Sequence, residues 1–328
     1  MKKRILAGLG ITAAAVLLAG CSGTGQETTS PDDDGGAGAP SGGDHTYAVV
    51  THAPPGDAFW DRIKSGAEQA GVDYDATIVY NGDPDPALQS QLIDNAVAQE
   101  VDGIVVSMAN PEGVKTSVEA AVAAGVPVVT INAGMEESAE YGALTHIGQS
   151  ESVAGAAVGE RLSEEGFENV ICVIQEAGHV GLEERCSSAG GAFSGEMDNI
   201  IVDGRNDAEV KNTLRAKLQS DDSIDGVLTL GGQYAIDAVG AVEESGSAAR
   251  VATFDLSSDV LTEIEDGRVV FAVDQQPFVQ GYVGVTSLYL NTINGNVLGG
   301  GQPVYSGPAF VTAENAEAIS EFAANGTR

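Results

Sequence analysis

The chain has 328 residues, 43% of them hydrophobic, and a formal net charge of −33 at pH 7. Its length predicts two domains, and its apolar content is sufficient for substantial cores. The acidic surface repels phosphate backbones and anionic headgroups, which excludes nucleic-acid binding and adsorption to anionic lipid.

The N-terminus has the pattern of an export signal. Residues 2–4 are basic, residues 5–18 are apolar, and small residues precede Cys21. The apolar run is shorter than the roughly 20 residues of a membrane-spanning helix, which argues against a transmembrane anchor. Its end, Leu18-Ala19-Gly20-Cys21, resembles the lipobox of bacterial lipoproteins and implies cleavage before Cys21 and diacylation of its thiol. Residues 1–20 are thus expected to be a signal peptide, and the mature protein to be extracytoplasmic, attached to the cell membrane by this lipid alone.

Residues 21–45 are expected to be the lipidated cysteine and a flexible linker. The stretch is rich in Gly, Ser, Thr, Pro and Asp and has no apolar periodicity. Its run of three aspartates, residues 32–34, is expected to be a solvated charge cluster, because a flexible linker does not preorganise a calcium site.

Two further cysteines, Cys172 and Cys186, follow in the exported part. An oxidising compartment favours a disulfide between them, and two buried thiols are the alternative. Two cysteines without a nearby histidine pair do not make a zinc site. We expect no metal and no cofactor, since ATP and NAD(P)H are unavailable outside the cell.

From residue 46 onward, short β-branched runs alternate with segments of helical period. This alternation is typical of parallel sheets covered by helices on both faces. The expected strands are 47–51, 74–80, 103–106, 126–131, 170–174, 199–202, 226–230, 251–255 and 270–273, with short ones near 303–305 and 309–311. The expected helices include 59–70, 87–98, 114–123, 153–162, 208–218, 234–243 and 279–290.

The series of strands and helices runs twice along the chain. We therefore predict an α/β fold of two doubly wound parallel-sheet lobes, joined by a hinge of several chain crossings. Residues 46–147 plus 277–303 are expected to form lobe 1, and residues 148–276 plus 304–328 lobe 2. Ligands of such sheets bind beyond the carboxyl ends of the strands, so the two lobes would offer loops to one cleft.

Several polar motifs follow the expected strands in a specific order. They are Gly56-Asp57-Ala58-Phe59-Trp60, Asn132-Ala133-Gly134, Glu183-Glu184-Arg185-Cys186, Gly231-Gly232-Gln233-Tyr234, Thr253-Phe254-Asp255 and Asp274-Gln275-Gln276-Pro277. Over residues 46–312 the chain resembles the type I periplasmic binding proteins of the ribose-binding family, the sugar-capturing subunits of ABC importers. The resemblance implies a binding protein that is not an enzyme.

In the first lobe, the resemblance implies ligand contacts by Asp57, Phe59, Trp60 and Asn132. Carboxylate and amide groups hydrogen-bond hydroxyls, and aromatic faces pack against sugar C–H groups. The alternative is that Asp57 caps a helix while Phe59 and Trp60 belong to the core. The family often has an Asp-Arg pair where this chain has Asn132-Ala133. This departure makes ribose itself a poor candidate.

In the second lobe, the resemblance places Arg185 in the cleft, where a guanidinium suits vicinal hydroxyls or a carboxylate. An exposed salt bridge to Glu183 or Glu184 is the competing interpretation. His179, in the preceding loop, could reach the ligand, although a single loop histidine usually faces solvent.

Three more binding residues are expected at strand ends: Gln233, Asp255 and Gln275. Asp255 combines a cleft position with a possible helix N-cap role. Gln233 would substitute for the family's polar residue at a position where this chain has glycine. Gln276 belongs either to the hinge or to the site, and Asn110 is a lesser candidate.

The expected function is capture of a small sugar or polyol by hinge closure and its delivery to ABC permease subunits, by a monomer. A lipoprotein that signals to a chemoreceptor or sensor kinase would use the same domain. A secreted hydrolase is disfavoured because no Gly-x-Ser-x-Gly elbow is present. A LacI-type regulator shares the fold but is excluded by the exported N-terminus and the missing helix-turn-helix.

Overall fold

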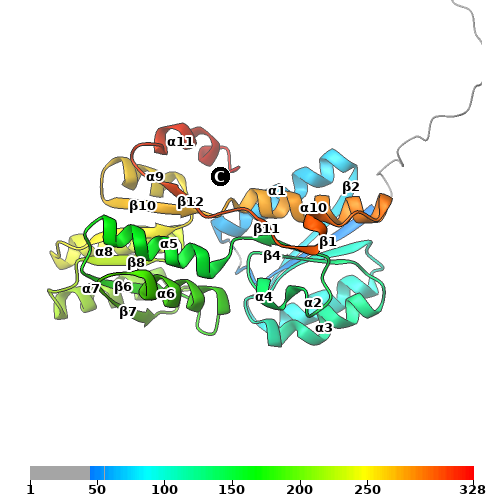
Figure 1. Cartoon of the computed structure of the whole chain (residues 1–328), viewed down its shortest axis with the longest axis horizontal. Coiled ribbons are helices and arrows are strands. Elements are labelled where there is room, and N and C mark those ends of the chain that lie inside the picture. The colour runs from blue at the N-terminus through cyan, green and yellow to red at the C-terminus, as the bar shows by residue number, and fades with distance from the viewer. Residues whose placement is uncertain (1–44, 55) are drawn as a thin grey trace, which may run out of the picture. The chain divides into compact units, whose positions relative to one another are not determined.

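The structure is a computed structural model that describes residues 45–54 and 56–328. The expected signal peptide, Cys21 and nearly all of the expected linker lie outside these residues. The described chain forms two six-stranded sheets, each in its own lobe (Figure 1). The predicted α/β fold of two doubly wound lobes is confirmed.

The first sheet has the order β11-β5-β4-β3-β1-β2, and all its pairs are parallel. Two of its inner strands, β3 and β4, are short and buried throughout, as expected for a sheet covered on both faces. The strands are β1 (His45–Thr51), β2 (Ala76–Gly82), β3 (Gly103–Ser107), β4 (Val128–Ile131), β5 (His146–Gly148) and β11 (Val304–Tyr305).

The second sheet repeats this arrangement in the order β12-β10-β9-β8-β6-β7. Only its edge strand β12 is antiparallel, paired with β10. The strands are β6 (Asn169–Ile174), β7 (Glu196–Ile201), β8 (Gly226–Thr229), β9 (Arg250–Phe254), β10 (Val269–Asp274) and β12 (Ala309–Val311).

Helices cover both faces of each sheet, so every lobe has two apolar cores. In the first lobe, α1 and α10 pack on one face and α2 and α3 on the other (Figure 1). In the second lobe, α5 and α6 cover one face and α7, α8, α9 and α11 the other. The helices are α1 (Ala58–Tyr74), α2 (Pro86–Ala98), α3 (Pro111–Ala123), α4 (Met135–Ser138), α5 (Glu151–Glu164), α6 (Val180–Ala192), α7 (Asp207–Ser220), α8 (Gly232–Ser245), α9 (Ser258–Glu265), α10 (Pro277–Asn294) and α11 (Ala316–Ala324), with a 3₁₀ helix at Leu298–Gly301.

The chain passes between the lobes three times: after β5, after β10 and after β11. Hydrogen bonds join the crossings near Ser306. Its N–H donates to the carbonyl of Gly148 (2.7 Å), and its own carbonyl accepts from the Gln276 side-chain amide (2.7 Å). The crossings therefore form one linked hinge. Among the described residues, no helix is both long and apolar enough to cross a bilayer.

The structure differs from the sequence-based expectations in three places. α1 continues to Tyr74 and ends where Asp75 adopts a left-handed conformation (φ 51°), so β2 begins later than expected. β5 was not anticipated, because three residues carry no periodicity. Residues 304–328 were expected in lobe 2, yet β11 pairs with β5 of the first sheet.

Candidate functional site

Three of the expected site residues form one hydrogen-bonded chain between the lobes. Asn132 follows β4, Asp255 follows β9, and Gln275 lies in the second crossing. The Asn132 side-chain amide donates to Gln275 Oε1 (3.1 Å), and Gln275 Nε2 donates to Asp255 Oδ1 (2.7 Å). All three side chains are buried. The carboxyl ends of the two sheets are thereby connected through polar groups suited to hydroxyls.

The backbone at these strand ends is unusual. Asn132 (φ 63°), Asp255 (φ 70°) and Gln276 (φ 53°) all lie in the left-handed region. Such conformations cost on the order of 1–3 kcal/mol each outside glycine and concentrate at ligand sites. Asn and Asp tolerate them best, because their short side chains bond locally. The structure therefore holds these residues in place against a local cost.

Asp255 is a buried carboxyl group. Burial raises its pKa from 3.8 to about 7, although the nearby Arg185 charge and the Gln275 hydrogen bond oppose this rise. The expected N-cap role is wrong, because Ser257 caps α9. The Asp255 carboxyl instead accepts from Gln275 through Oδ1.

Arg185 is 3% exposed and lies on α6. Its Nη2 donates to Glu151 Oε1 (2.8 Å), its Nε donates to the other Glu151 oxygen, and its guanidinium lies 4.8 Å from the Phe254 ring centre. The alternative of an exposed salt bridge to a neighbour on its own helix is wrong, since the partner is Glu151 at the start of α5. The positive charge of Arg185 is thus paired with a carboxylate of its own lobe.

The Asp57 region forms the start of α1. The Asp57 carboxylate accepts from the backbone N–H groups of Phe59 (2.8 Å) and Trp60 (3.4 Å), so it caps the helix, and burial raises its pKa. Trp60 is 7% exposed and packs with the first-lobe core, while the partly exposed Phe59 meets it edge-on (5.2 Å). Asp57 therefore caps α1 and Trp60 packs in the core, as the alternative to ligand contact stated.

His52 is not among the residues that the sequence singled out, and His179 is there only as a lesser candidate. His52 directly follows β1, and His179 is the N-cap of α6. Both are buried, and their rings meet edge-to-face with centres 5.0 Å apart. The alternative that His179, as a single loop histidine, faces solvent is wrong. The position of His52 directly after a buried strand could have indicated a candidate site residue.

Three other candidates lie elsewhere or serve the backbone. Gln233 is exposed on α8 and joins none of these clusters. Its neighbour Tyr234 is half-buried and donates to the Gly204 carbonyl (3.2 Å). Asn110 caps α3 by accepting from the Gly113 N–H (3.0 Å). Gln276 serves the hinge through its bond to Ser306.

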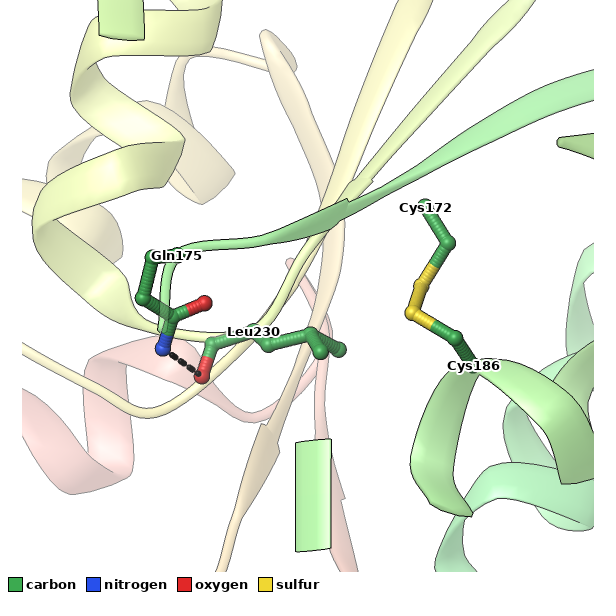
Figure 2. The surroundings of a disulfide bond; sticks show 4 residues. All are labelled: Cys172, Gln175, Cys186 and Leu230. Atoms are coloured by element: carbon green, nitrogen blue, oxygen red, sulfur yellow. Dashed lines mark hydrogen bonds between the residues drawn. A yellow bond between two sulfur atoms is a disulfide. The ribbon is translucent and has the colours of Figure 1, made fainter. Parts of the chain in front are cut away.

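A disulfide connects Cys172 in β6 with Cys186 in α6 (Figure 2). Three residues along the chain from Cys172, Gln175 donates to the Leu230 carbonyl (3.4 Å), which links the end of β6 to that of β8 (Figure 2). Because α6 carries His179 and Arg185, the disulfide holds the helix that supplies both side chains against its sheet.

The comparisons with known proteins identify the family of the chain. Residues 47–295 match the family model described as the periplasmic binding protein domain, so the chain belongs to this family. Its fold is that of the type I periplasmic binding proteins.

Three similar proteins illustrate the relationship. A solved carbohydrate transporter from Acidothermus cellulolyticus 11B, in complex with myo-inositol, is 45% identical; the alignment covers 87% of this chain and 99% of that one, with a TM-score of 0.85. The ribose import binding protein RbsB of Bacillus subtilis (strain 168) is 25% identical over 68% of this chain and 74% of its own length. A solute-binding protein from Burkholderia graminis C4D1M with D-arabinose has a TM-score of 0.74 at 22% identity over 83% of this chain and 96% of that one, which shows the shared fold.

Proposed function

We propose that this protein is the extracytoplasmic solute-binding lipoprotein of an ABC importer. It captures a small neutral sugar or polyol between its lobes and delivers it to the permease subunits. Myo-inositol is the first candidate ligand. The observation that carries the proposal is the buried chain from Asn132 through Gln275 to Asp255, since it presents amide and carboxyl groups from both lobes at one place.

The charges at this place favour a neutral ligand. Asp57 and Asp255 are carboxyl groups, and Arg185 is paired with Glu151. An anion would meet the acidic groups without an unmatched cation to receive it, whereas hydroxyls can both donate to carboxylates and accept from amides. A polyhydroxylated neutral molecule fits this set of groups best.

The similar proteins support the same class. The 45% identical relative was solved with myo-inositol, and the more distant RbsB proteins carry ribose in their names. This chain has Asn132-Ala133 where the ribose-binding family often has an Asp-Arg pair. The departure from that pattern disfavours ribose, and the 45% identical relative favours a cyclic polyol.

Calorimetry with the mature domain tests the ligand. We expect binding of myo-inositol, and weaker or no binding of ribose and arabinose. Asp255→Ala should raise the Kd by at least about tenfold, because a hydrogen bond to a charged group contributes about 1.5–3 kcal/mol. Asp259→Ala removes an exposed carboxylate of α9 and serves as the control. Absence of binding by every polyol and sugar tested would overturn the proposed function.

Fractionation of cells that express the full chain tests the lipid anchor. Cys21→Ser removes the thiol that the lipobox pattern marks for acylation, so the variant should move from the membrane fraction to the soluble exported fraction. Ser22→Ala is the matched control and should leave the distribution unchanged. An unaltered membrane fraction for Cys21→Ser contradicts lipidation.

A further inference from the structure

The contact between His52 and His179 is made by one residue from each lobe. The planes of the two histidine rings are inclined at 83° to each other. Trp60 meets the His52 ring edge-on, with ring centres 4.5 Å apart. Next to this contact, the Val180 N–H donates to the Ala109 carbonyl across the lobes (3.1 Å). The histidine pair therefore lies where the lobes touch, beside the expected site.

The hydrogen bonds of His179 determine which ring nitrogen carries its proton. Nδ1 accepts from the backbone N–H groups of Gly181 (3.1 Å) and Leu182 (3.4 Å). A nitrogen that accepts hydrogen bonds has no proton of its own, so the neutral ring is protonated at Nε2. Nε2 makes no hydrogen bond to any residue in the two described ranges. It is an N–H donor pointing away from the helix that its own ring caps.

Both histidines are neutral at physiological pH. Burial lowers the pKa of His52 to about 3, with a further contribution from the Arg185 charge. Burial also lowers the pKa of His179 well below 6.5, assisted by His52. Two neutral rings can hydrogen-bond hydroxyls without attracting an anion.

Glu176 completes the cluster. It follows β6, and one of its oxygens lies within 4.8 Å of a ring nitrogen of each histidine. Two histidines and a carboxylate also resemble a metal-ligand set. A metal-bound histidine, however, normally donates its other ring N–H to a partner. His179 Nδ1 instead faces two N–H donors, so Nε2 cannot bind a metal while the neutral ring keeps its cap.

We propose that His52 and His179 are specificity-determining ligand contacts for a neutral cyclic polyol. His179 donates from Nε2 to one ligand hydroxyl, and Glu176 accepts from a hydroxyl nearby. The pair restricts the site to the unphosphorylated polyol, because a phosphate would meet Glu176 and Asp255 while the nearby cation, Arg185, is already paired with Glu151. This inference rests on the proposed function and assigns the contacts within it.

His179→Asn separates ligand contact from helix capping. Asparagine is among the best N-cap residues, so α6 keeps its cap while the ring N–H is lost. We expect an unchanged melting temperature without ligand and a rise of about tenfold or more in the Kd for myo-inositol. Asn206→Ser, which exchanges one good cap for another at the start of α7, is the control and should leave the Kd unchanged. His52→Ala should also weaken binding, and the double variant shows whether the two effects are coupled.

These binding measurements distinguish failure of the histidine proposal from failure of the proposed function. If the wild-type protein binds myo-inositol and both single variants bind equally well, the histidine proposal is overturned and the proposed function stands. If the wild type binds no polyol, both fall together. Binding of inositol monophosphate as tight as that of myo-inositol also contradicts the proposed specificity.

Two measurements need no ligand. Nitrogen-15 NMR should show His179 as the Nε2–H tautomer between pH 5 and 8, and an Nδ1–H or protonated ring would contradict the assignment. Addition of Zn²⁺ alone should leave the melting temperature unchanged. A rise in melting temperature that His179→Asn abolishes would identify a metal site instead.

Discussion

Asp255 lies at a strand end within the proposed binding site. The residue lies directly after a buried strand, in a left-handed conformation, and its carboxyl group bonds Gln275. The interior of the lobe cannot solvate a charge, which is why burial raises the pKa of Asp255 to about 7. Ligand hydroxyls would replace the missing water around this group.

The raised pKa of Asp255 predicts a pH-dependent stability. Between 3.8 and about 7 the folded protein retains a proton that the unfolded chain has released, so this group's contribution to the free energy of unfolding falls as pH rises through that window. The limit for one proton is about 1.4 kcal/mol per pH unit. In Asp255→Asn the group cannot titrate, and its carbonyl still accepts from Gln275.

Urea unfolding of both proteins at several values from pH 4.5 to 7.5 measures this effect. The stability of the wild type relative to Asp255→Asn should decrease with rising pH and level off above 7. The difference is the informative quantity, because the buried histidines His52, His146 and His179, whose pKa values are lowered, act in the opposite direction below pH 6.5. Parallel stability curves would show that Asp255 titrates normally.

At the scale of elements, glycines bring pairs of helices into backbone contact. A Cβ at Gly281 of α10 would lie 2.0 Å from the Ile63 carbonyl of α1, and one at Gly66 of α1 would lie 2.0 Å from the Phe278 carbonyl. In the second lobe, a Cβ at Gly159 of α5 would lie 2.2 Å from the Ala189 carbonyl of α6. Each lobe therefore has one helix pair that only glycine allows to pack this closely.

Gly281→Ala should destabilise the protein, since the new methyl group has no space and the helices must separate. Overpacking of this kind typically costs about 1–3 kcal/mol. Gly191→Ala in α6 is the matched control: its Cβ would meet no atom within 4 Å, and alanine should add about 0.5–1 kcal/mol through helix propensity. Chemical denaturation should show a lower free energy of unfolding than the wild type for Gly281→Ala and a higher one for Gly191→Ala. A neutral Gly281→Ala would mean that α1 and α10 adjust freely.

At the scale of the whole molecule, the proposed function depends on the contacts between the two lobes. The contacts that join the lobes near the site are the His52–His179 ring pair, the Val180–Ala109 backbone bond and the Asn132–Gln275 bond. A ligand favours the closed arrangement only through its affinity for both lobes at once.

Small-angle scattering tests this closure. Saturating myo-inositol should reduce the radius of gyration of the mature domain, because the ligand adds contacts that only the closed arrangement offers. Asp255→Ala at the same ligand concentration should keep the ligand-free value, since it lacks a main contact. Equal scattering curves for the wild type with and without bound ligand would argue against hinge closure.

Much of the fold follows from local pattern. The inner strands, such as 103–107 and 226–229, are short apolar runs, and their neighbouring helices have clear periodicity. The candidate residues Asn132 and Asp255 could be placed at strand ends for the same reason, because they directly follow such strands. β5 and β11 were harder, since two or three residues become a strand only when a neighbouring strand offers hydrogen bonds.

The amino-acid sequence by itself determined the export pattern, the twofold series of strands and helices, and the polar residues at strand ends, because each is a property of neighbouring residues. Only the tertiary structure decided that Arg185 pairs with Glu151, that Gln233 faces solvent, and that the two histidines meet. The two contacts join residues far apart in the chain. The exposure of Gln233, like the energies of those contacts, depends on burial that no local pattern records.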